Sequence, residues 1–187
     1  MKRPQNVFLV GPMGAGKSTI LSAVRARIRG LAYSVSHTTR EPRGEEADGR
    51  DYYFVPPDHF RKMVKRGEFV EWAEVYGNLY GTSLAELNRL LRLENDVALD
   101  VDSQGAWNIR KHFPGSVLIY ILPPSLEELE ARLRERGTDE EPVIRSRMEE
   151  AVREMGNCFQ YDYVVFNDDL EVSVEEVRSI IVSERCR

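Results

Sequence analysis

The sequence has few cysteines and no long apolar run. Its two cysteines, Cys158 and Cys186, match no metal-binding spacing and are too few for a disulfide framework. We expect free thiols in a reducing cytosol, and a single disulfide is the alternative. No apolar run approaches the roughly 20 residues that a membrane-spanning helix needs. Residues 1–6 lead directly into the first predicted strand, so we expect no signal peptide, a cytoplasmic location and no membrane partner.

An excess of charge of one sign is also lacking. The formal net charge is −5, and proteins that bind nucleic acids usually carry a basic face, so no nucleic-acid partner is expected. This balance does not exclude a local basic pocket. With 42% hydrophobic and 30% charged residues, the composition is typical of a soluble globular protein. A chain of 187 residues predicts one domain with a substantial core, with or without small inserted lobes.

The most informative stretch that is present covers residues 11–19, G-P-M-G-A-G-K-S-T, which matches the pattern G-x-x-x-x-G-K-S/T. An apolar run precedes it and a segment with helical apolar spacing follows it. A strand, a glycine-rich turn and a helix N-terminus direct several backbone N–H groups at one point, where they bind phosphate oxygens. An ordinary glycine-rich turn is the alternative, and the complete motif in this context argues against it.

The motif predicts a site for a nucleoside triphosphate. Lys17 would reach the β- and γ-phosphates, and the Ser18 hydroxyl would bind Mg²⁺. The residues expected to bind ATP here are Gly11, Pro12, Met13, Gly14, Ala15, Gly16, Lys17, Ser18 and Thr19. The motif does not identify the second substrate, because several classes of ATPase, GTPase and kinase carry it.

Apolar strands alternate with helices along most of the chain. Residues 97–102 and 117–122 are the clearest strands, and such alternation predicts a parallel sheet with helices on both faces. Asp100 and Asp102 lie at the carboxyl end of a strand, where ligands bind to sheets of this kind. Residues 33–92 contain shorter strands, which predict a small inserted mixed lobe.

Turn residues and capping boxes predict several element boundaries. Residues 77–81 are expected to form a turn between a strand and a helix. Ser83, Ser125 and Ser173 each precede a glutamate by three residues, so each is expected to cap the N-terminus of a helix. A long helix is expected to end near Phe159.

Two groups of arginines could serve phosphoryl transfer. An acceptor phosphate is already ionised at neutral pH, so the reaction needs charge neutralisation and alignment rather than a general base. Arg40 and Arg43 flank a proline in a polar loop that also offers the hydroxyls of Ser36 and Tyr52. The second group lies on both sides of residues 137–142 and comprises Arg132, Arg136, Arg145 and Arg147. A solvated surface arginine is the alternative in each case.

Taken together, the sequence resembles the guanylate kinases. The matching segments, in the order of the family, are 34–43 (SVSHTTREPR), 49–54 (GRDYYF), 68–73 (EFVEWA), 77–82 (GNLYGT), 99–105 (LDVDSQG), 136–138 (RGT) and 167–170 (NDDL). They span nearly the whole chain and are far more specific than the phosphate loop alone. The resemblance implies an α/β P-loop fold in a single guanylate kinase-like domain of residues 1–187. The implied parts are a core of residues 1–35, 93–136 and 148–187, a mixed α/β GMP-binding lobe of residues 36–92, and a lid of residues 137–147.

The resemblance also implies roles for individual residues. The GMP phosphate would be bound by Ser36, Arg40, Arg43, Tyr52 and Tyr80, and the guanine base by Glu71, Thr82 and Asp100. The residues implied in catalysis are Lys17, Arg40, Arg136 and Arg147. Arg132 and Asn167 would lie near adenine. Asp102 would lie beside the metal, with water between them if it interacts at all.

Glu71 also has an independent physical argument. Guanine presents N1–H and its exocyclic amine as adjacent donors, and one carboxylate can accept both. Adenine presents an unprotonated N1 at the same position. A buried carboxylate left without its partners would cost several kcal/mol, on the order of 10³-fold in selectivity. The strand pattern alone predicts a solvent-facing glutamate, and the family motif reverses that interpretation.

The reaction implied is ATP + GMP = ADP + GDP with Mg²⁺, in purine nucleotide metabolism, with dGMP as a further expected acceptor. The first alternative is a related interaction module that has lost catalysis, and the intact Lys17 and Ser18 argue against it. The second is a kinase for a sugar phosphate or another monophosphate, which would not need the base-binding set of Glu71, Thr82 and Asp100. The phosphate loop also resembles that of shikimate kinases, but the other motifs do not fit that family. His37 is interpreted as a surface histidine, with an effect on the pH dependence of phosphate binding as the alternative.

Overall fold

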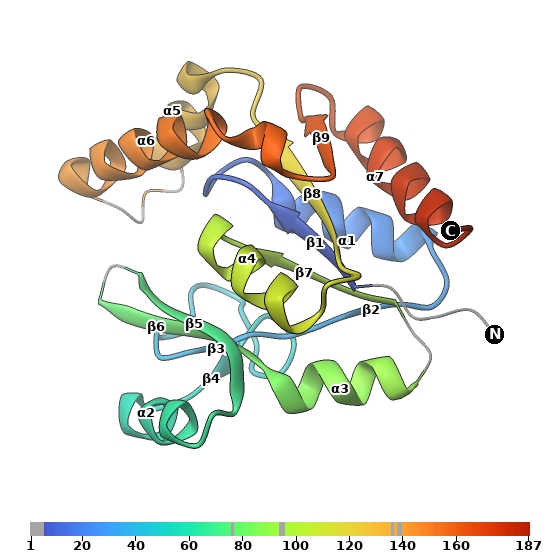
Figure 1. Cartoon of the computed structure of the whole chain (residues 1–187). Helices are drawn as coiled ribbons and strands as arrows, with labels where there is room; N and C mark the ends of the chain where they lie inside the picture. Colours follow the sequence, from blue (N-terminus) through green and yellow to red (C-terminus); the bar gives the residue numbers. More distant parts are fainter. Residues whose placement is uncertain (1–5, 76, 94–95, 136, 138–139) are drawn as a thin grey trace.

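The computed structural model describes residues 6–75, 77–93, 96–135, 137 and 140–187 (Figure 1). Within these residues the larger sheet has five parallel strands in the spatial order β2 (Leu31–Tyr33), β7 (Asp96–Val101), β1 (Asn6–Val10), β8 (Val117–Leu122) and β9 (Tyr163–Phe166). The helices that follow its strands are α1 (Lys17–Arg27), α4 (Ser103–His112), α5 (Leu126–Glu135), α6 (Glu141–Met155) and α7 (Leu170–Glu184). This is the α/β fold with a parallel sheet that the sequence predicts.

The strands β1, β7 and β8 are buried on both faces of the larger sheet, which explains why they are largely apolar. In β1, Val7 and Leu9 pack against α1 and α7, whereas Phe8 and Val10 pack with side chains of α4 and of α3 (Leu84–Arg92). Residues of a strand alternate between the two faces of a sheet, so a strand that is covered on both faces is apolar at most positions. The strand β8 has the bounds expected from the sequence.

A second sheet is formed by residues between 37 and 83. Its strands, in spatial order, are β4 (Tyr53–Phe54), β3 (His37–Thr38), β6 (Asn78–Ser83) and β5 (Phe69–Val75). β3 pairs in parallel with β4 and antiparallel with β6, so the sheet is mixed. The helix α2 (Pro57–Lys65) covers it, with the Phe60 ring stacked on Phe69 at 4.4 Å.

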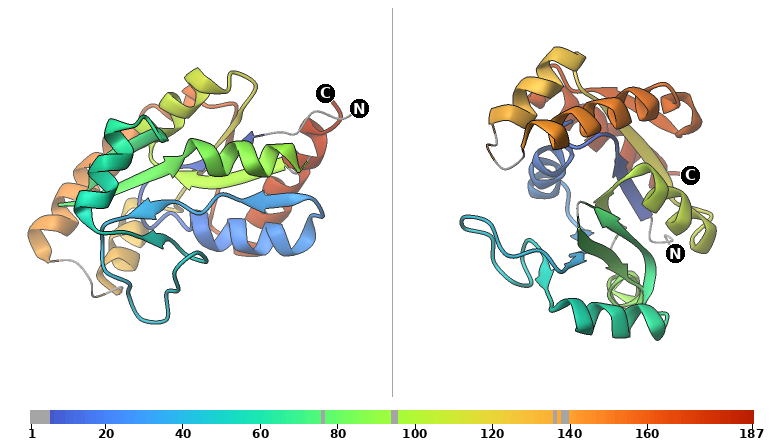
Figure 2. Two further views of the ribbon diagram at one scale, coloured as in Figure 1. Left: turned by 90° about the horizontal axis from the view of Figure 1, so that it is seen from below. Right: turned by 90° about the vertical axis from the view of Figure 1, so that its left-hand side faces the viewer.

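The second sheet and the helix pair α5–α6 lie at opposite ends of the molecule, with the larger sheet between them (Figures 1 and 2). The helix α3 links the two sheets, because it follows β6 directly and buries Leu87 and Leu90 in the core of the larger one. The carboxyl ends of β1 and β7 therefore lie between the two outer parts of the structure.

Three expected boundaries need correction. Residues 77–81 are not simply a turn, because β6 begins at Asn78 and runs through Gly81. A side chain at Gly81 would lie 2.9 Å from the Phe69 ring, so this glycine makes room for packing inside a strand. The helix α6 ends at Met155, before Phe159.

The third correction concerns the last helix. Ser173 does not cap it: α7 begins at Leu170, and the carboxylate of Asp169 accepts the Val172 N–H at 3.0 Å. Ser173 is buried within the helix, where its hydroxyl donates to the Phe166 carbonyl. The caps at Ser83 and Ser125 are confirmed, with side-chain oxygens accepting the N–H groups of Glu86 and Glu128.

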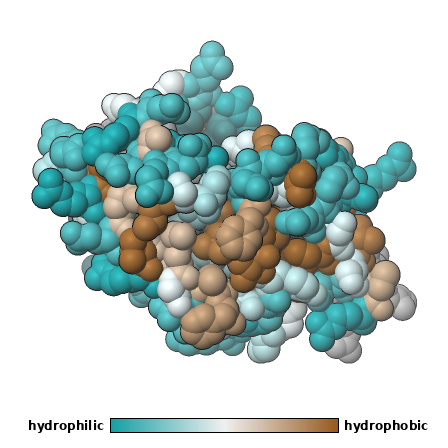
Figure 3. All heavy atoms as spheres, turned by 90° about the horizontal axis from the view of Figure 1, so that it is seen from above, coloured by the Kyte–Doolittle hydropathy of each residue, from teal (hydrophilic) through white to brown (hydrophobic). Residues whose placement is uncertain are grey.

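The surface on the side of α5, α6, β9 and α7 is hydrophilic at its rim and has apolar residues across its middle (Figure 3). Exposed apolar side chains on or beside these elements include Val152, Phe159, Phe166 and Val172. Within the described part of the chain, no helix is both long and apolar enough to cross a bilayer. Cys158 and Cys186 are free thiols.

Candidate active site

The phosphate loop lies between the end of β1 and the start of α1. Gly11, Gly14 and Gly16 have positive φ angles of 140°, 95° and 92°. A Cβ on Gly11 would lie 2.4 Å from the carbonyl oxygen of Ile121 in β8, a backbone atom that cannot move aside. The Lys17 ammonium lies over the loop and donates to the carbonyls of Gly11, at 2.5 Å, and Pro12, at 3.1 Å. A glycine-rich turn between a strand and a helix N-terminus is the arrangement in which backbone N–H groups bind anions.

Asn167 holds the phosphate loop from the end of β9. Its side-chain amide is buried and donates to the Ala15 carbonyl at 2.7 Å. A Cβ on Gly16 would lie 2.3 Å from the same amide nitrogen, so this position also requires glycine. The sequence predicts that Asn167 lies near adenine. Its hydrogen bond to the phosphate loop is a different role, which was not predicted from the sequence.

Asp100 lies beside the phosphate loop. Its Oδ2 accepts a hydrogen bond from the Ser18 hydroxyl at 2.6 Å, and its Oδ1 accepts one from the Tyr33 hydroxyl at 2.9 Å. Burial, followed by the charge of Asp100, raises the pKa of Tyr33, so the tyrosine keeps its proton and remains a donor. The hydroxyl of Ser18 and the carboxylate of Asp100 are oxygen ligands of the kind that Mg²⁺ prefers.

A second carboxylate site lies between the two sheets. The β5–β6 register pairs Glu71 with Thr82, and the buried Thr82 hydroxyl donates to Glu71 Oε1 at 2.5 Å. Asp102 accepts the Gly105 N–H at 2.7 Å at the start of α4. A Cβ on Gly105 would lie 3.2 Å from both Asp102 Oδ1 and Glu71 Oε2, so the two carboxylates flank one point.

Glu71 is a strongly perturbed acid. Burial raises its pKa to about 7; the Thr82 hydrogen bond opposes this rise, and the charge of Asp102 adds to it. Near neutral pH this carboxyl group is therefore poised between its two protonation states. A ligand that donates hydrogen bonds to it would favour the ionised form.

The two aspartates of this segment are placed in the reverse of the implied order. Asp100, expected at the base, contacts Ser18 of the phosphate loop. Asp102, expected beside the metal, lies next to Glu71. The reason is that β7 ends at Val101 and the chain then turns into α4, which packs against β5 and carries Asp102 toward the second sheet.

Arg40, Tyr52 and Tyr80 come together in the second sheet and its loop. The Arg40 guanidinium lies 5.5 Å from the centre of the Tyr52 ring, and the rings of Tyr52 and Tyr80 are 6.0 Å apart. Ser36 is half-buried next to them, where its carbonyl accepts the Tyr53 N–H. Burial, then the charge of Asp100, raises the pKa of Tyr52.

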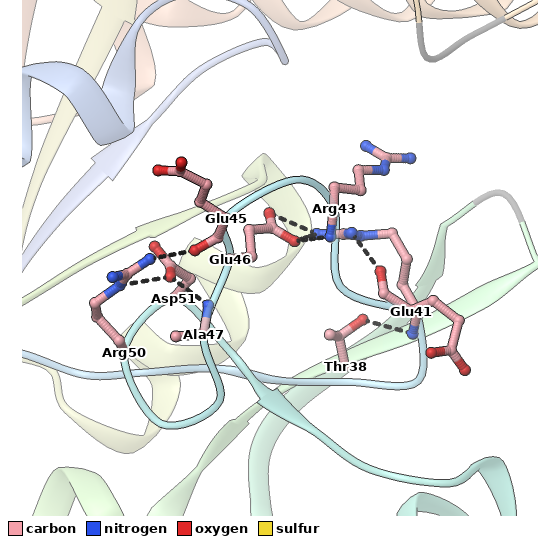
Figure 4. A network of polar contacts seen from close by, with 9 residues as sticks. Thr38, Glu41, Arg43, Glu45, Glu46, Ala47, Arg50 and Asp51 are labelled. Atoms are coloured by element: carbon pink, nitrogen blue, oxygen red, sulfur yellow. Dashed lines mark hydrogen bonds and ion pairs between the residues drawn. The ribbon is translucent and has the colours of Figure 1, made fainter.

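The backbone of Arg43 is held by Glu46, a residue that the sequence analysis missed (Figure 4). The Arg43 side chain points away from this network in Figure 4. In the sequence, Glu46 is simply one more acidic residue of a polar loop. Its position three residues after Arg43, which suits a capping contact, is the one feature that could have indicated this hydrogen bond.

The arginines of the second predicted group differ in their surroundings. Arg147 on α6 is buried, and its Nη1 contacts the sulfur of Met13 in the phosphate loop. Arg132 on α5 donates to Glu128 of the same helix at 2.9 Å and is partly exposed. The helix α5 contacts the loop, because a Cβ on Gly14 would lie 2.9 Å from Leu129. Arg136 lies outside the described residues.

His37 is not a surface residue. Its ring lies 4.8 Å from that of Tyr53 and 5.6 Å from that of Phe69, and it is half-buried. Burial, followed by the charge of the nearby His59, lowers its pKa. It is therefore a largely neutral member of an aromatic cluster.

Comparison with known proteins gives consistent matches along the whole chain. Residues 3–184 match the family model described as guanylate kinase. A guanylate kinase of Carboxydothermus hydrogenoformans is 45% identical over 187 residues, which cover 100% of this chain and 92% of the relative. A guanylate kinase of Geobacter metallireducens is 45% identical over 188 residues, which cover 100% of this chain and 93% of the relative.

Among solved structures, a guanylate kinase from Anaplasma phagocytophilum is similar with a TM-score of 0.79 and 31% identity. The match covers 100% of this chain and 89% of that one. A shikimate kinase from Bacteroides thetaiotaomicron matches with a TM-score of 0.53 and 18% identity, covering 95% of this chain and 98% of that one, which shows a shared fold alone.

The geometry at Glu71 generates a prediction about its titration. In the unliganded protein the Glu71 carboxyl should titrate near pH 7. Thr82→Val removes a hydrogen bond that favours the ionised form, worth roughly 1 kcal/mol, and should raise the pKa by about one pH unit. Carbon-13 NMR of the glutamate carboxyls across pH 4–9 measures both values. The control is Thr39→Val, which removes a hydroxyl that accepts the Leu79 N–H in the same sheet. Titration of Glu71 at an ordinary value near 4.5 in the parent protein would contradict the assignment.

Proposed function

The chain belongs to the guanylate kinase family, and from this premise we propose how its residues take part in the family's reaction. It is a kinase that transfers the γ-phosphoryl group of ATP to GMP, which gives ADP and GDP. Its substrates are nucleotides, and the family generally uses a metal ion with ATP. The complete phosphate loop, including Lys17 and Ser18, argues against an interaction module that has lost catalysis.

The observation that carries the choice of acceptor is the hydrogen-bonded pair of the half-buried Glu71 and the buried Thr82, with Asp102 beside it. We propose that Glu71 and Asp102 accept hydrogen bonds from N1–H and the exocyclic amine of guanine, while the Thr82 hydroxyl orients Glu71. Adenine would present an acceptor nitrogen to these carboxylates and leave them unpaired. The proposal exchanges the implied roles of Asp100 and Asp102, and it is supported by the contact of Asp100 with Ser18.

The acceptor phosphate would be bound by Ser36, Arg40, Arg43, Tyr52 and Tyr80. Support comes from the proximity of Arg40, Tyr52 and Tyr80. A guanidinium group and protonated phenols are donors suited to a phosphate dianion, and the raised pKa of Tyr52 keeps its proton in place. The proposed contacts involve only the base and the phosphate, so we propose dGMP as a further acceptor.

The triphosphate would be bound by the N–H groups of residues 11–19 and by Lys17, with Arg132 and Asn167 toward the nucleoside. The Lys17 ammonium donates to the neutral carbonyls of Gly11 and Pro12. Charged phosphate oxygens are stronger acceptors, so the ammonium would exchange these contacts for the β- and γ-phosphates. Asn167 would then contribute mainly by holding the Ala15 carbonyl.

Mg²⁺ is the metal that the residues fit. Ser18 and Asp100 would hold it, directly or through water, and it would supply positive charge to the triphosphate. In the part of the chain that the structure describes, no group of three or more His, Cys, Asp or Glu side chains forms a metal site. Mg²⁺ generally keeps several waters and is bound by one or two protein groups together with substrate phosphates, so Ser18 and Asp100 would be sufficient protein ligands.

In the transfer step an oxygen of the GMP phosphate would attack the γ-phosphorus of ATP, and the bond to the β,γ-bridging oxygen would break. The acceptor oxygen is already ionised, so no side chain needs to remove a proton. Lys17, Arg40, Arg136 and Arg147 would balance the charge, and for Arg147 the support is its contact with Met13 of the loop.

Closure of a GMP lobe (36–92) and a lid (137–147) on the core would exclude water, which otherwise would hydrolyse ATP. A cytosolic location is also proposed, supported by the free thiols of Cys158 and Cys186.

Acceptor specificity tests the proposed function directly. We expect ADP formation from ATP and Mg²⁺ when GMP is offered, with dGMP as a second acceptor and no turnover with AMP, UMP, CMP or shikimate. A coupled assay for ADP measures each acceptor separately. Turnover with another acceptor would contradict the base site, and binding of both ATP and GMP without turnover would favour the interaction module.

The pH dependence of GMP affinity tests the role of Glu71. Guanine requires the ionised carboxylate, so affinity should rise with pH as Glu71 loses its proton near pH 7. Between pH 6 and pH 8 this group alone should strengthen binding about tenfold. Ionisation of the GMP phosphate, with a second pKa near 6, should add about twofold.

Calorimetric titration of GMP at both pH values measures the effect. The matched control is Glu71→Gln. In this variant GMP affinity should be low at both pH values, and only the roughly twofold pH dependence that comes from ionisation of the GMP phosphate should remain. Equal pH dependence in the two proteins would remove Glu71 from the base site.

A further inference from the structure

A single carboxylate organises the loop that carries the proposed phosphate-binding arginines. Both carboxylate oxygens of Glu46 lie 2.9 Å from Arg40 Nη2. Its Oε2 also accepts the backbone N–H of Arg43 at 2.8 Å (Figure 4). One side chain therefore fixes the guanidinium of Arg40 and the turn from which Arg43 extends.

The Arg40 guanidinium is constrained on further sides. Its Nη1 donates to the Glu41 carbonyl at 2.6 Å, and its Cζ lies 5.5 Å and 6.0 Å from the centres of the Tyr52 and Phe54 rings. The side chain is only 10% exposed, whereas Glu46 is 26% exposed. A free arginine side chain loses conformational entropy when it binds a ligand, and a group that fixes the side chain beforehand reduces that loss.

We propose that Glu46 is a positioning residue for the acceptor phosphate. It does not bind the substrate; it holds Arg40 and the Arg43 turn in the arrangement that receives the phosphate dianion. The inference rests on the proposed function, since it assumes that Arg40 and Arg43 bind that group. Both oxygens of Glu46 accept hydrogen bonds. A glutamine has the same shape but cannot replace it, because the glutamine NH₂ group would face the N–H donors of Arg40.

The same loop contains a matched carboxylate that lacks this role. Asp51 accepts the Ala47 N–H at 2.9 Å and the Arg50 Nε–H at 2.8 Å, and Arg50 also donates to the Glu45 carbonyl. Like Glu46, it combines a backbone hydrogen bond with an ion pair. Neither of its partners belongs to the proposed phosphate site, so Asp51 separates general ordering of the loop from orientation of Arg40.

The test compares GMP with guanosine, which carries the same base without a phosphate. In Glu46→Gln, GMP affinity should fall about 10- to 100-fold, the range typical when a group that orients a ligand-binding side chain is lost. Guanosine affinity should stay within about twofold, because the Glu71 site is untouched. Asp51→Asn should change neither affinity by more than about threefold. NMR titration of the full-length proteins measures both ligands, and the KM for ATP should be unchanged in both variants.

Each other outcome would overturn the inference. Equal loss of GMP and guanosine binding in Glu46→Gln would show that Glu46 only maintains the lobe. Unchanged GMP affinity would show that Arg40 needs no such support. An equal loss in Asp51→Asn would assign the effect to loop order in general. If the parent protein bound neither ligand, the proposed function itself would fail and the inference with it, a result that the parent protein alone reveals.

Discussion

The hydrogen bond between Ser18 and Asp100 is the contact on which the arrangement of the site depends. β7 lies between β2 and β1, and its register sets Asp100 opposite Leu9, just before the chain enters the phosphate loop. Tyr33, from the neighbouring strand β2, holds the other carboxylate oxygen. Two residues later the chain turns into α4, and Asp102 lies beside Glu71. The end of one strand thus supplies a carboxylate to each proposed nucleotide site and fixes their spacing.

The proposed base site would achieve selectivity through Glu71, an acid that its surroundings make costly to ionise. Burial raises the pKa of Glu71 to about 7, so the folded protein holds this proton more tightly than the unfolded chain does. Its contribution to the free energy of unfolding is therefore largest below about pH 4.5 and is lost as the pH rises through about 7. Guanine would offset this loss of stability by donating hydrogen bonds to the ionised carboxylate, whereas a base without those donors would not. The same physical chemistry would make the proposed base site both selective for guanine and sensitive to pH.

Much of this structure could be predicted from the sequence, and the errors have definite causes. The phosphate loop at residues 11–19 and the parallel sheet follow from a complete motif and from apolar strands. Asp100 and Asp102 have identical chemistry and lie two positions apart, so only the turn into α4 separates their surroundings. Gly81 indicated a turn because glycine usually does, although here it makes room for aromatic rings. Glu46 gave no signal because its role depends on three-dimensional contacts with Arg40.

The central claim is that the two aspartates at the end of β7 serve different nucleotides, and GMP affinity in two isosteric variants tests it most directly. Asparagine at position 102 can still cap α4, so both variants should fold. Calorimetry should show GMP affinity reduced about tenfold or more in Asp102→Asn, which loses a charged acceptor for guanine, and nearly unchanged in Asp100→Asn. The reverse pattern, with GMP binding lost in Asp100→Asn and retained in Asp102→Asn, would contradict the account.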